Sequence, residues 1–132
     1  MKINPYLHFN GTCAEAFKFY EKILGGKIQM AMPFGDHAPS PDWKDKIMHS
    51  GMTVGDITLM GTDAPPQYFQ KPEGFRVSLA VDLPAEADRI FSGLSDGGTV
   101  DSPIQETFFA KRFGMVTDKF GTPWMVMGGQ TN

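Results

Sequence analysis

An internal repeat is the feature that most constrains the fold of this sequence. Residues 49–61 (HSGMTVGDITLMG) and residues 112–128 (RFGMVTDKFGTPWMVMG) each read as an apolar strand, a turn and a second apolar strand. The turn of the second stretch contains Gly121, which can adopt the positive φ that other residues resist. Both stretches are therefore predicted to be β-hairpins.

The helices that precede the two hairpins repeat as well. The triplet Ala-Glu-Ala occurs at residues 14–16 and again at 85–87, and an aromatic residue follows at the same spacing, at Tyr20 and at Phe91. Apolar residues in both segments recur at the i, i+3, i+4 spacing of a helix with one buried side. We therefore expect one structural module that occurs twice in the chain.

Each half of the chain is predicted to contain a strand, a helix and three further strands. In the first half these are residues 6–10, 13–24, 27–32, 47–54 and 57–60. In the second half they are residues 76–82, a helix from Pro84 to near Gly97, residues 99–109 and the hairpin 112–128. The predicted fold class is α+β, with duplicated βαβββ modules that form an open, curved, eight-stranded mixed sheet around a cleft. One domain is expected. It consists of two repeats, residues 1–63 and 75–129, joined by a connector, residues 64–74.

Two local signals concern the first half. Thr12 and Glu15 have the spacing of a capping box, in which the threonine hydroxyl accepts a hydrogen bond from the first helical turn. Residues 33–45 contain three prolines and no periodic pattern, which predicts a long loop. Phe34 and Trp43 in this loop could close over a ligand or contact a partner chain, or the loop could simply lie on the surface.

Charge and composition exclude several classes of function. The net charge is -3 at pH 7 and no cluster of Lys and Arg exceeds the pair at 111–112, so neither a nucleic acid nor an anionic membrane is an expected partner. No apolar run approaches the ~20 residues of a membrane span. The protein is therefore expected in the cytoplasm. Its single cysteine, Cys13, falls on the apolar side of a predicted helix, which is typical of a buried hydrophobic residue.

Three stretches carry a resemblance to a known superfamily: residues 5–26 (PYLHFNGTCAEAFKFYEKILGG), 49–65 (HSGMTVGDITLMGTDAP) and 108–127 (FFAKRFGMVTDKFGTPWMVM). With a duplicated βαβββ module and a histidine in its first strand, the sequence resembles the vicinal oxygen chelate superfamily. This superfamily includes glyoxalase I, extradiol dioxygenases and fosfomycin and bleomycin resistance proteins. Within it the chain looks most like the PhnB-like branch labelled 3-demethylubiquinone-9 3-methyltransferase. The resemblance implies a homodimer and a small-molecule ligand.

The resemblance also implies where metal ligands would lie. Metal-dependent members take a His or Glu-type ligand from the first and last strand of each module, and His8 matches the first position. The equivalent position in the second module is Ser78, and Met125 stands where a glutamate would be. A thioether is too soft to replace a carboxylate on a hard divalent cation. No cofactor is therefore favoured, although a divalent metal held by His8 together with His49, Glu106 or a water remains an alternative.

Several candidate site residues allow two interpretations each. His8 could act as a general base or bind a ligand in the cleft, or it could be a strand histidine bonded to a neighbour. Ser78 is expected on the same side of its sheet as the ligand, because strand alternation groups it with the position equivalent to His8. Met60 and Met125 could line an adaptable apolar pocket or lie in the core.

Arg112 is a further candidate, with the aromatic residues Phe108 and Trp124 close to it in the sequence. Its planar guanidinium could grip a carboxylate or a phosphonate of a ligand. The alternative is an ion pair with Glu106 or Asp118 that braces the hairpin, because exposed charges usually pair locally.

The residues give no support to methyl transfer. Enzymes that bind S-adenosylmethionine commonly have a Gly-rich turn after the first strand of a parallel sheet, and no GxGxxG follows a strand here. The expected function is the binding of a small organic ligand in an apolar cleft without an obligatory metal. A metal-dependent lyase, isomerase or dioxygenase is the first alternative and a methyltransferase the second. Whether any reaction is catalysed stays open.

Overall fold

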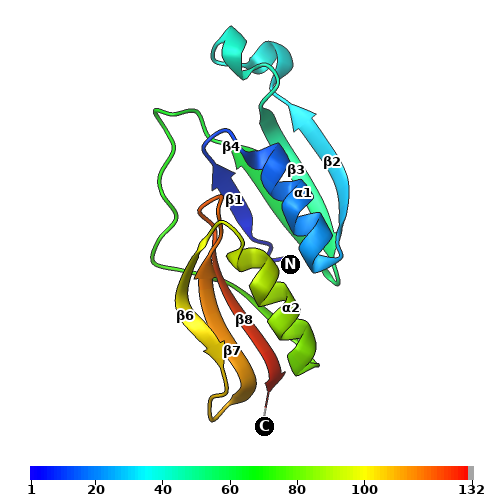
Figure 1. Ribbon diagram of the computed structural model, residues 1–132. Helices are drawn as coiled ribbons and strands as arrows, with labels where there is room; N and C mark the ends of the chain where they lie inside the picture. The colour runs from blue at the N-terminus through cyan, green and yellow to red at the C-terminus, as the bar shows by residue number, and fades with distance from the viewer. Residues whose placement is uncertain (131–132) are drawn as a thin grey trace. The chain divides into compact units, whose positions relative to one another are not determined.

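The computed structural model describes residues 1–130, and the chain divides into two compact units, one of residues 1–70 and one that begins at residue 71. Each unit contains a strand, a helix and three further strands in that order (Figure 1). The predicted duplication of a βαβββ module is confirmed, and the eight strands form two four-stranded mixed sheets, one in each unit.

The first unit has the strand order β1-β4-β3-β2, in which β1 and β4 are parallel and the other pairs antiparallel. Its regular elements are β1 (Tyr6–Phe9), α1 (Cys13–Leu24), β2 (Lys27–Pro33), β3 (Ile47–Val54) and β4 (Ile57–Asp63). The segment predicted as a long loop contains two short 3-10 helices, η1 (Gly35–His37) and η2 (Pro41–Trp43). Within it the Phe34 and Trp43 rings pack edge to face, with centroids 6.0 Å apart.

The second unit repeats this topology, with the strand order β5-β8-β7-β6 and a parallel pair β5 and β8. Its elements are β5 (Val77–Val81), α2 (Pro84–Ser95), β6 (Thr99–Gln105), β7 (Ala110–Thr117) and β8 (Pro123–Gln130). The predicted strand at 99–109 ends at Gln105, and residues 106–109 form the connection to β7. Pro84 occupies the first turn of α2. The N–H groups of a first turn have no partner within the helix, so the N–H that proline lacks is not needed there.

Each helix covers one face of the sheet in its own unit (Figure 1). In each unit the core lies between the helix and the sheet that it covers. In the first unit its largest fully buried side chains are Phe9, Phe17, Tyr20, Met52 and Leu59, and in the second they are Leu94, Val116, Trp124 and Val126. We call the opposite side of each sheet, which its own helix does not cover, the open face. Because strand residues alternate between the two sides, the open face receives every second side chain.

Two equivalent glycines allow each helix to approach its sheet closely. A Cβ at Gly61 of β4 would lie 2.6 Å from Cε1 of Phe17, and a Cβ at Gly128 of β8 would lie 2.5 Å from Cβ of Ala87. No real side chain tolerates such distances without a shift of its neighbours. Glycine at these positions therefore sets the distance between helix and sheet in both units.

The start of α1 differs from the prediction. The Thr12 side chain makes no capping hydrogen bond, so the predicted capping box is absent. The buried carboxylate of Asp63 accepts instead, from the backbone N–H of Cys13 at 2.9 Å and from that of Ile47 at 2.8 Å. A charged acceptor from a distant strand makes a stronger bond than a hydroxyl, and it pairs the buried N–H of the first residue of α1.

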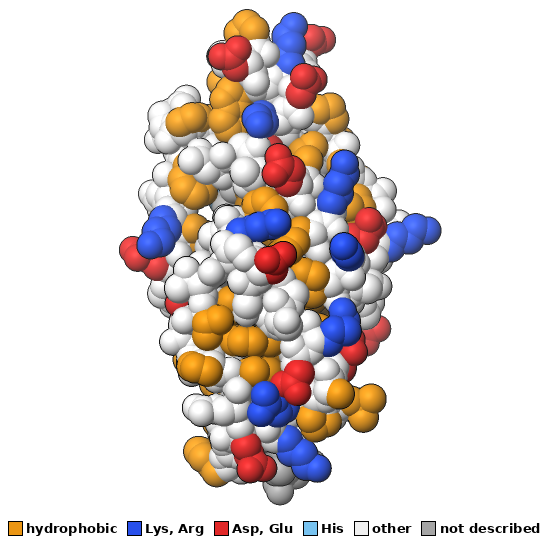
Figure 2. Space-filling view, viewed as in Figure 1, with side chains coloured by type: hydrophobic (Ala, Val, Ile, Leu, Met, Phe, Trp, Pro, Cys, Tyr) orange, Lys and Arg blue, Asp and Glu red, His pale blue; other side chains and the backbone are white. Residues whose placement is uncertain are grey.

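The surface carries both signs of charge. Figure 2 shows Lys and Arg side chains interspersed with Asp and Glu, with hydrophobic side chains between them, and neither sign gathers into a large patch on the visible face. Within residues 1–130, neither helix has the length and apolar character that a membrane crossing requires.

Candidate functional site

The open face of the first unit carries a cluster of polar rings. Tyr6 and His8 are both exposed on β1, and the Tyr6 ring centroid lies 5.7 Å from that of His8 and 5.6 Å from that of His49 on β3. A hydrogen bond of 2.8 Å joins Tyr6 Oη to His49 Nδ1. Met60 of β4 is paired with Tyr6 across the parallel strands and lies beside the cluster. Burial raises the pKa of the Tyr6 hydroxyl, with a smaller contribution from Cys13, so this hydroxyl stays protonated at neutral pH.

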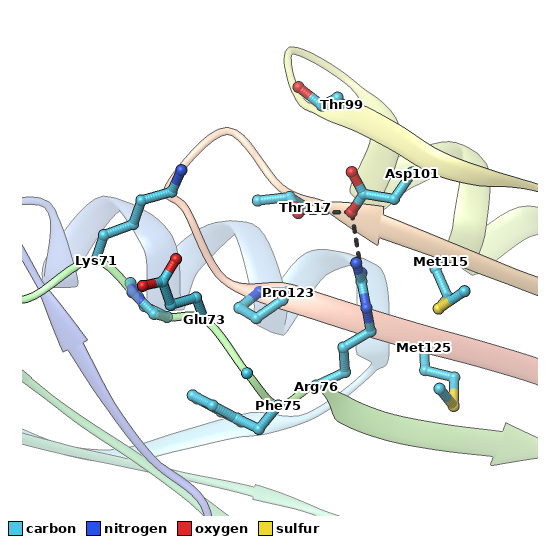
Figure 3. Close-up of a pocket in the computed structure, with 12 residues that line it drawn as sticks. Lys71, Glu73, Phe75, Arg76, Thr99, Asp101, Met115, Thr117, Pro123 and Met125 are labelled. Carbon is cyan, nitrogen blue, oxygen red and sulfur yellow. Dashed lines mark hydrogen bonds and ion pairs between the residues drawn. The ribbon is translucent and has the colours of Figure 1, made fainter.

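The open face of the second unit contains a pocket of about 690 Å³. One wall is the chain segment 71–76, and the floor comes from β6, β7 and β8 (Figure 3). The side chains on which the chemistry of the pocket depends are Phe75, Arg76, Asp101, Met115, Thr117 and Met125. Pockets of a few hundred cubic ångströms that combine apolar walls with a small number of polar groups are typical of small-molecule sites.

A polar network crosses this pocket. Arg76, immediately before β5, forms an ion pair of 3.0 Å with Asp101 of β6, although β5 and β6 are the two opposite edges of the sheet (Figure 3). The Arg76 Nη1 group also donates to the carbonyl oxygen of Trp124 at 3.2 Å. The Thr117 hydroxyl donates to Asp101 Oδ2 at 2.7 Å. The bond from Thr117, and then the Arg76 guanidinium, hold the pKa of Asp101 below its usual range, so Asp101 is a carboxylate at neutral pH.

Four of the predicted site residues lie on open faces, two in each unit. His8 and Met60 share the open face of the first unit. Ser78 and Met125 are direct cross-strand neighbours on the open face of the second, and Met125 also lines the pocket. The structure therefore places Met125 in the lining of the pocket, with Ser78 as its cross-strand neighbour, and it places His8 in the ring cluster of the first unit.

The other three predicted residues lie elsewhere. Arg112 extends toward α2 and forms an ion pair of 2.6 Å with Asp88, so its partner is neither a ligand in the pocket nor Glu106 or Asp118. Trp124 is a core residue with 2% of its surface exposed, and its Nε1 donates to Asp118 Oδ2 at 2.8 Å. Phe108 lies in the connection between β6 and β7, almost fully exposed, with its ring 5.1 Å from that of Phe109.

Sequence reasoning missed Arg76, Asp101, Thr117 and Phe75. A signal for Arg76 was present, because strand alternation places it on the same side as Ser78. No comparable signal existed for Asp101. Its position in the pocket depends on an irregularity in the pairing of β6 with β7 between Val100 and Ser102.

The side chains at the positions implied for a metal do not fit a hard divalent cation. They are one imidazole, one hydroxyl and one thioether, from His8, Ser78 and Met125. Among residues 1–130, no three His, Cys, Asp or Glu side chains group closely enough to hold a metal ion. Oxygen-rich and imidazole-rich sites suit the divalent ions of such enzymes, whereas thioethers suit soft ions. The donor set thus argues against a metal at these positions.

The single cysteine is confirmed as a buried residue. Cys13 is fully buried at the start of α1. Burial, and then the nearby Asp63 carboxylate, raise the pKa of its thiol to about 12. Because the thiolate is the nucleophilic form, Cys13 is chemically inert at neutral pH.

Comparisons with known proteins give matches that cover nearly the whole chain. The family described as 3-demethylubiquinone-9 3-methyltransferase matches residues 1–127. Protein YjdN of Escherichia coli is 34% identical over 96% of this chain and 94% of its own length. The crystal structure of protein PA1353 from Pseudomonas aeruginosa is 49% identical, covers 99% of both chains and superposes with a TM-score of 0.90.

More distant solved structures share the fold. A PhnB protein from Bacillus cereus, which bears the same methyltransferase name, is 23% identical over 97% of this chain and 99% of its own, with a TM-score of 0.85. Glyoxalase-type and bleomycin-resistance-type proteins also match at lower identity. At these identities the likeness concerns the fold and not the ligand or the reaction.

Proposed function

The chain belongs to the 3-demethylubiquinone-9 3-methyltransferase family, a PhnB-like branch with the vicinal oxygen chelate fold, and from this premise we propose that it binds a small organic molecule in the pocket of its second unit. The observation that carries the proposal is the pocket itself, which combines a floor that contains two thioethers with one ordered polar network. The ligand is bound without an obligatory metal, because the donor set described above does not fit one.

The apolar part of the pocket suits a ligand with a hydrophobic body. Met115 and Met125 are cross-strand partners on the floor, and the half-exposed ring of Phe75 stands at the wall. Methionine side chains are flexible and polarisable, so they adapt to ligands of different shape. The ring of Phe75 offers a flat surface against which an aromatic or aliphatic group can pack.

Three further features belong to this proposal. The protein acts in the cytoplasm as a homodimer, as its family resemblance suggests. His8 takes part in ligand binding or proton transfer only in a second role, because it lies beside Tyr6 in the first unit, whereas residues of the second unit line the pocket. The family name suggests methyl transfer. Neither mixed sheet, however, has a Gly-rich turn between a strand and a helix of the kind that commonly binds S-adenosylmethionine.

A titration with methionine methyl groups as reporters tests the proposed site. Protein labelled with 13C at the methionine methyls is titrated with a library of small aromatic and aliphatic compounds and followed by NMR. Binding in the pocket shifts the signals of Met115 and Met125, while Met52, which is buried under α1, stays unchanged and serves as the internal control. Shifts confined to Met30 and Met60 would move the site to the open face of the first unit and refute the proposal.

Elemental analysis tests the absence of an obligatory metal. Protein purified without chelator is expected to contain no stoichiometric divalent ion and to keep its melting temperature in EDTA. A stoichiometric ion that His8→Ala abolishes would instead support a metal-dependent lyase, isomerase or dioxygenase. Light scattering measures the mass in solution, and a monomer would contradict the homodimer.

A further inference from the structure

We propose that the pocket selects ligands that carry one carboxylate, and that the Nε and Nη2 groups of Arg76 bind it. The inference rests on the proposed function, because it assumes that this pocket holds a small organic molecule. It adds the chemical class of the ligand and the residue that recognises it.

The hydrogen bonds of Arg76 leave one edge of its guanidinium available. Both of its contacts, to Asp101 Oδ2 and to the Trp124 carbonyl, are made by Nη1. Within residues 1–130, the Nε and Nη2 groups have no hydrogen-bond partner. This edge carries two parallel N–H bonds, and their spacing matches the two oxygens of a carboxylate.

The other two arginines of the chain use this edge for the protein itself. Arg89 donates from Nε and from Nη2 to the two carboxylate oxygens of Glu86. Arg112 donates from Nε to Asp88 and from Nη2 to the Ile104 carbonyl. Arg76 is thus the only one of the three arginines whose two-pronged edge is unoccupied in the described chain, and it is the one that lines the pocket.

The guanidinium is also held in place before any ligand arrives. Asp101 anchors it from β6 and is itself held by Thr117 of β7, as the dashed lines of Figure 3 show. About a quarter of the Arg76 side chain is exposed, 26%, so the group is partly shielded and yet reachable. A preorganised donor loses little conformational freedom on binding, which favours affinity.

The charges around the pocket favour a ligand with one carboxylate over a ligand with several. Two positive side chains, Lys71 and Arg76, are balanced by two negative ones, Glu73 and Asp101. One carboxylate on Arg76 makes charge-assisted hydrogen bonds in a two-pronged geometry, whereas a second would meet only the point charge of the Lys71 ammonium. The rest of the ligand then contacts Met115, Met125 and Phe75, so an uncharged, apolar or aromatic body completes the class.

A pair of probes of nearly identical shape tests this class. Phenylacetate and the neutral phenylacetamide are titrated separately into the full chain at pH 7 by calorimetry and by the methionine methyl NMR signals. We expect phenylacetate to bind about tenfold more tightly, because hydrogen bonds to charged groups are stronger than neutral ones. Salt at 1 M should weaken the binding of phenylacetate more than that of phenylacetamide.

Arg76→Lys keeps the charge and removes the two-pronged edge. It is expected to weaken phenylacetate about tenfold and phenylacetamide less than twofold. Arg89→Lys is the matched control, since it makes the same change in an exposed ion pair of the same unit, and it should leave both affinities unchanged. Circular dichroism verifies that both variants are folded.

The outcomes separate this inference from the proposed function. If both probes shift Met115 and Met125 with equal affinity, the carboxylate selection is refuted and the binding pocket stands. If neither probe binds, both proposals fail. The comparison of the two probes on the unmodified protein needs no variant, so the inference stays refutable even if Arg76→Lys does not fold.

Discussion

The two units share a backbone plan and differ in the chemistry of their open faces. On the helix-covered side each has a glycine at the point of closest approach, Gly61 in one and Gly128 in the other. On the open side, the first unit carries the rings of Tyr6, His8 and His49, and the second carries a pocket crossed by an ion pair. The side that packs against the helix therefore maintains the fold, while the open side is free to acquire different functions.

Each unit also contains one buried aspartate that accepts backbone hydrogen bonds, and the two aspartates join different parts. Asp63 joins the first residue of α1 to the first residue of β3. Asp118 accepts from Phe120 and Thr122 in its own turn and from the Trp124 indole. The first unit thus depends on a long-range bond, whereas the second depends on a local one.

The largest expected effect distinguishes these two aspartates by the stability that each one contributes. Asp63→Asn leaves one buried N–H opposite an amide N–H, and we expect a loss of about 3 kcal/mol in the free energy of unfolding. Asp118→Asn keeps an oxygen for both turn N–H groups and loses the indole bond, so about 1 to 2 kcal/mol is expected. Urea unfolding measures both, and equal losses would contradict the distinction between a long-range and a local role.

The two glycines sharpen the comparison on the helix side. In Gly128→Ala the new methyl group meets Ala87 Cβ and the carbonyl oxygen of Leu83, which belong to rigid parts of the helix and its start. In Gly61→Ala it meets the buried ring edges of Phe17 and Phe9, which are side-chain atoms and can be displaced at a lower cost than the helix itself. We expect destabilisation of about 3 kcal/mol and about 1 kcal/mol respectively. Thermal melts that reverse this order would show that the Phe17 ring is the more rigid obstacle.

The thiol of Cys13 is expected to lower the stability of the first unit at alkaline pH. The second unit has no equivalent group, because the first residue of α2 is Pro84. In the folded state the pKa of the thiol is raised to about 12 from 9.0, so between these values the folded chain holds a proton that the unfolded chain releases. Stability therefore falls as pH rises above 9, by about 1 kcal/mol at pH 10.

Chemical denaturation at pH 7 and pH 10 measures this loss, with Cys13→Ala as the variant that lacks the ionising group. The variant should lose less stability than the unmodified protein over the same interval. Equal losses would assign the alkaline weakness to other residues. Native Cys13 should also resist a thiol-specific reagent at pH 8.

The smallest effects concern the two open faces. Tyr6→Phe removes the bond to His49, and Thr117→Val removes the bond to Asp101, each with little change of shape. Both bonds are partly exposed, so each substitution should cost about 0.5 kcal/mol. Only Thr117→Val should also weaken phenylacetate, which calorimetry would detect. An equal effect of Tyr6→Phe on that affinity would place the first unit in the binding site.

Much of the fold could be read from local patterns. The bounds Cys13–Leu24 and Ile47–Val54 match the predicted ones, because regular apolar spacing and a following Gly25 with a φ of 72° define a helix end without reference to the rest of the chain. Asp63 could not be recognised as the acceptor at the start of α1. Its role depends on a partner 50 positions away, which no local pattern reports.

The candidate site was harder to predict for two reasons. Trp124 and Met125 are neighbours on one strand, so alternation forbids both from facing the same side, and this constraint would have removed Trp124 from the ligand-binding set. The pairing of Arg76 with Asp101 connects the two edge strands of a sheet. Neither residue type nor spacing predicts that contact, because it arises from the folded sheet as a whole.

The position of Asp63 has a consequence for synthesis of the protein. Asp63 is the last residue of β4, yet it holds the beginning of α1 and the beginning of β3. During translation, α1 leaves the ribosome long before the carboxylate that completes its start. The first module therefore cannot reach its native hydrogen bonding in stages, and it is expected to fold in a single late step once β4 has emerged.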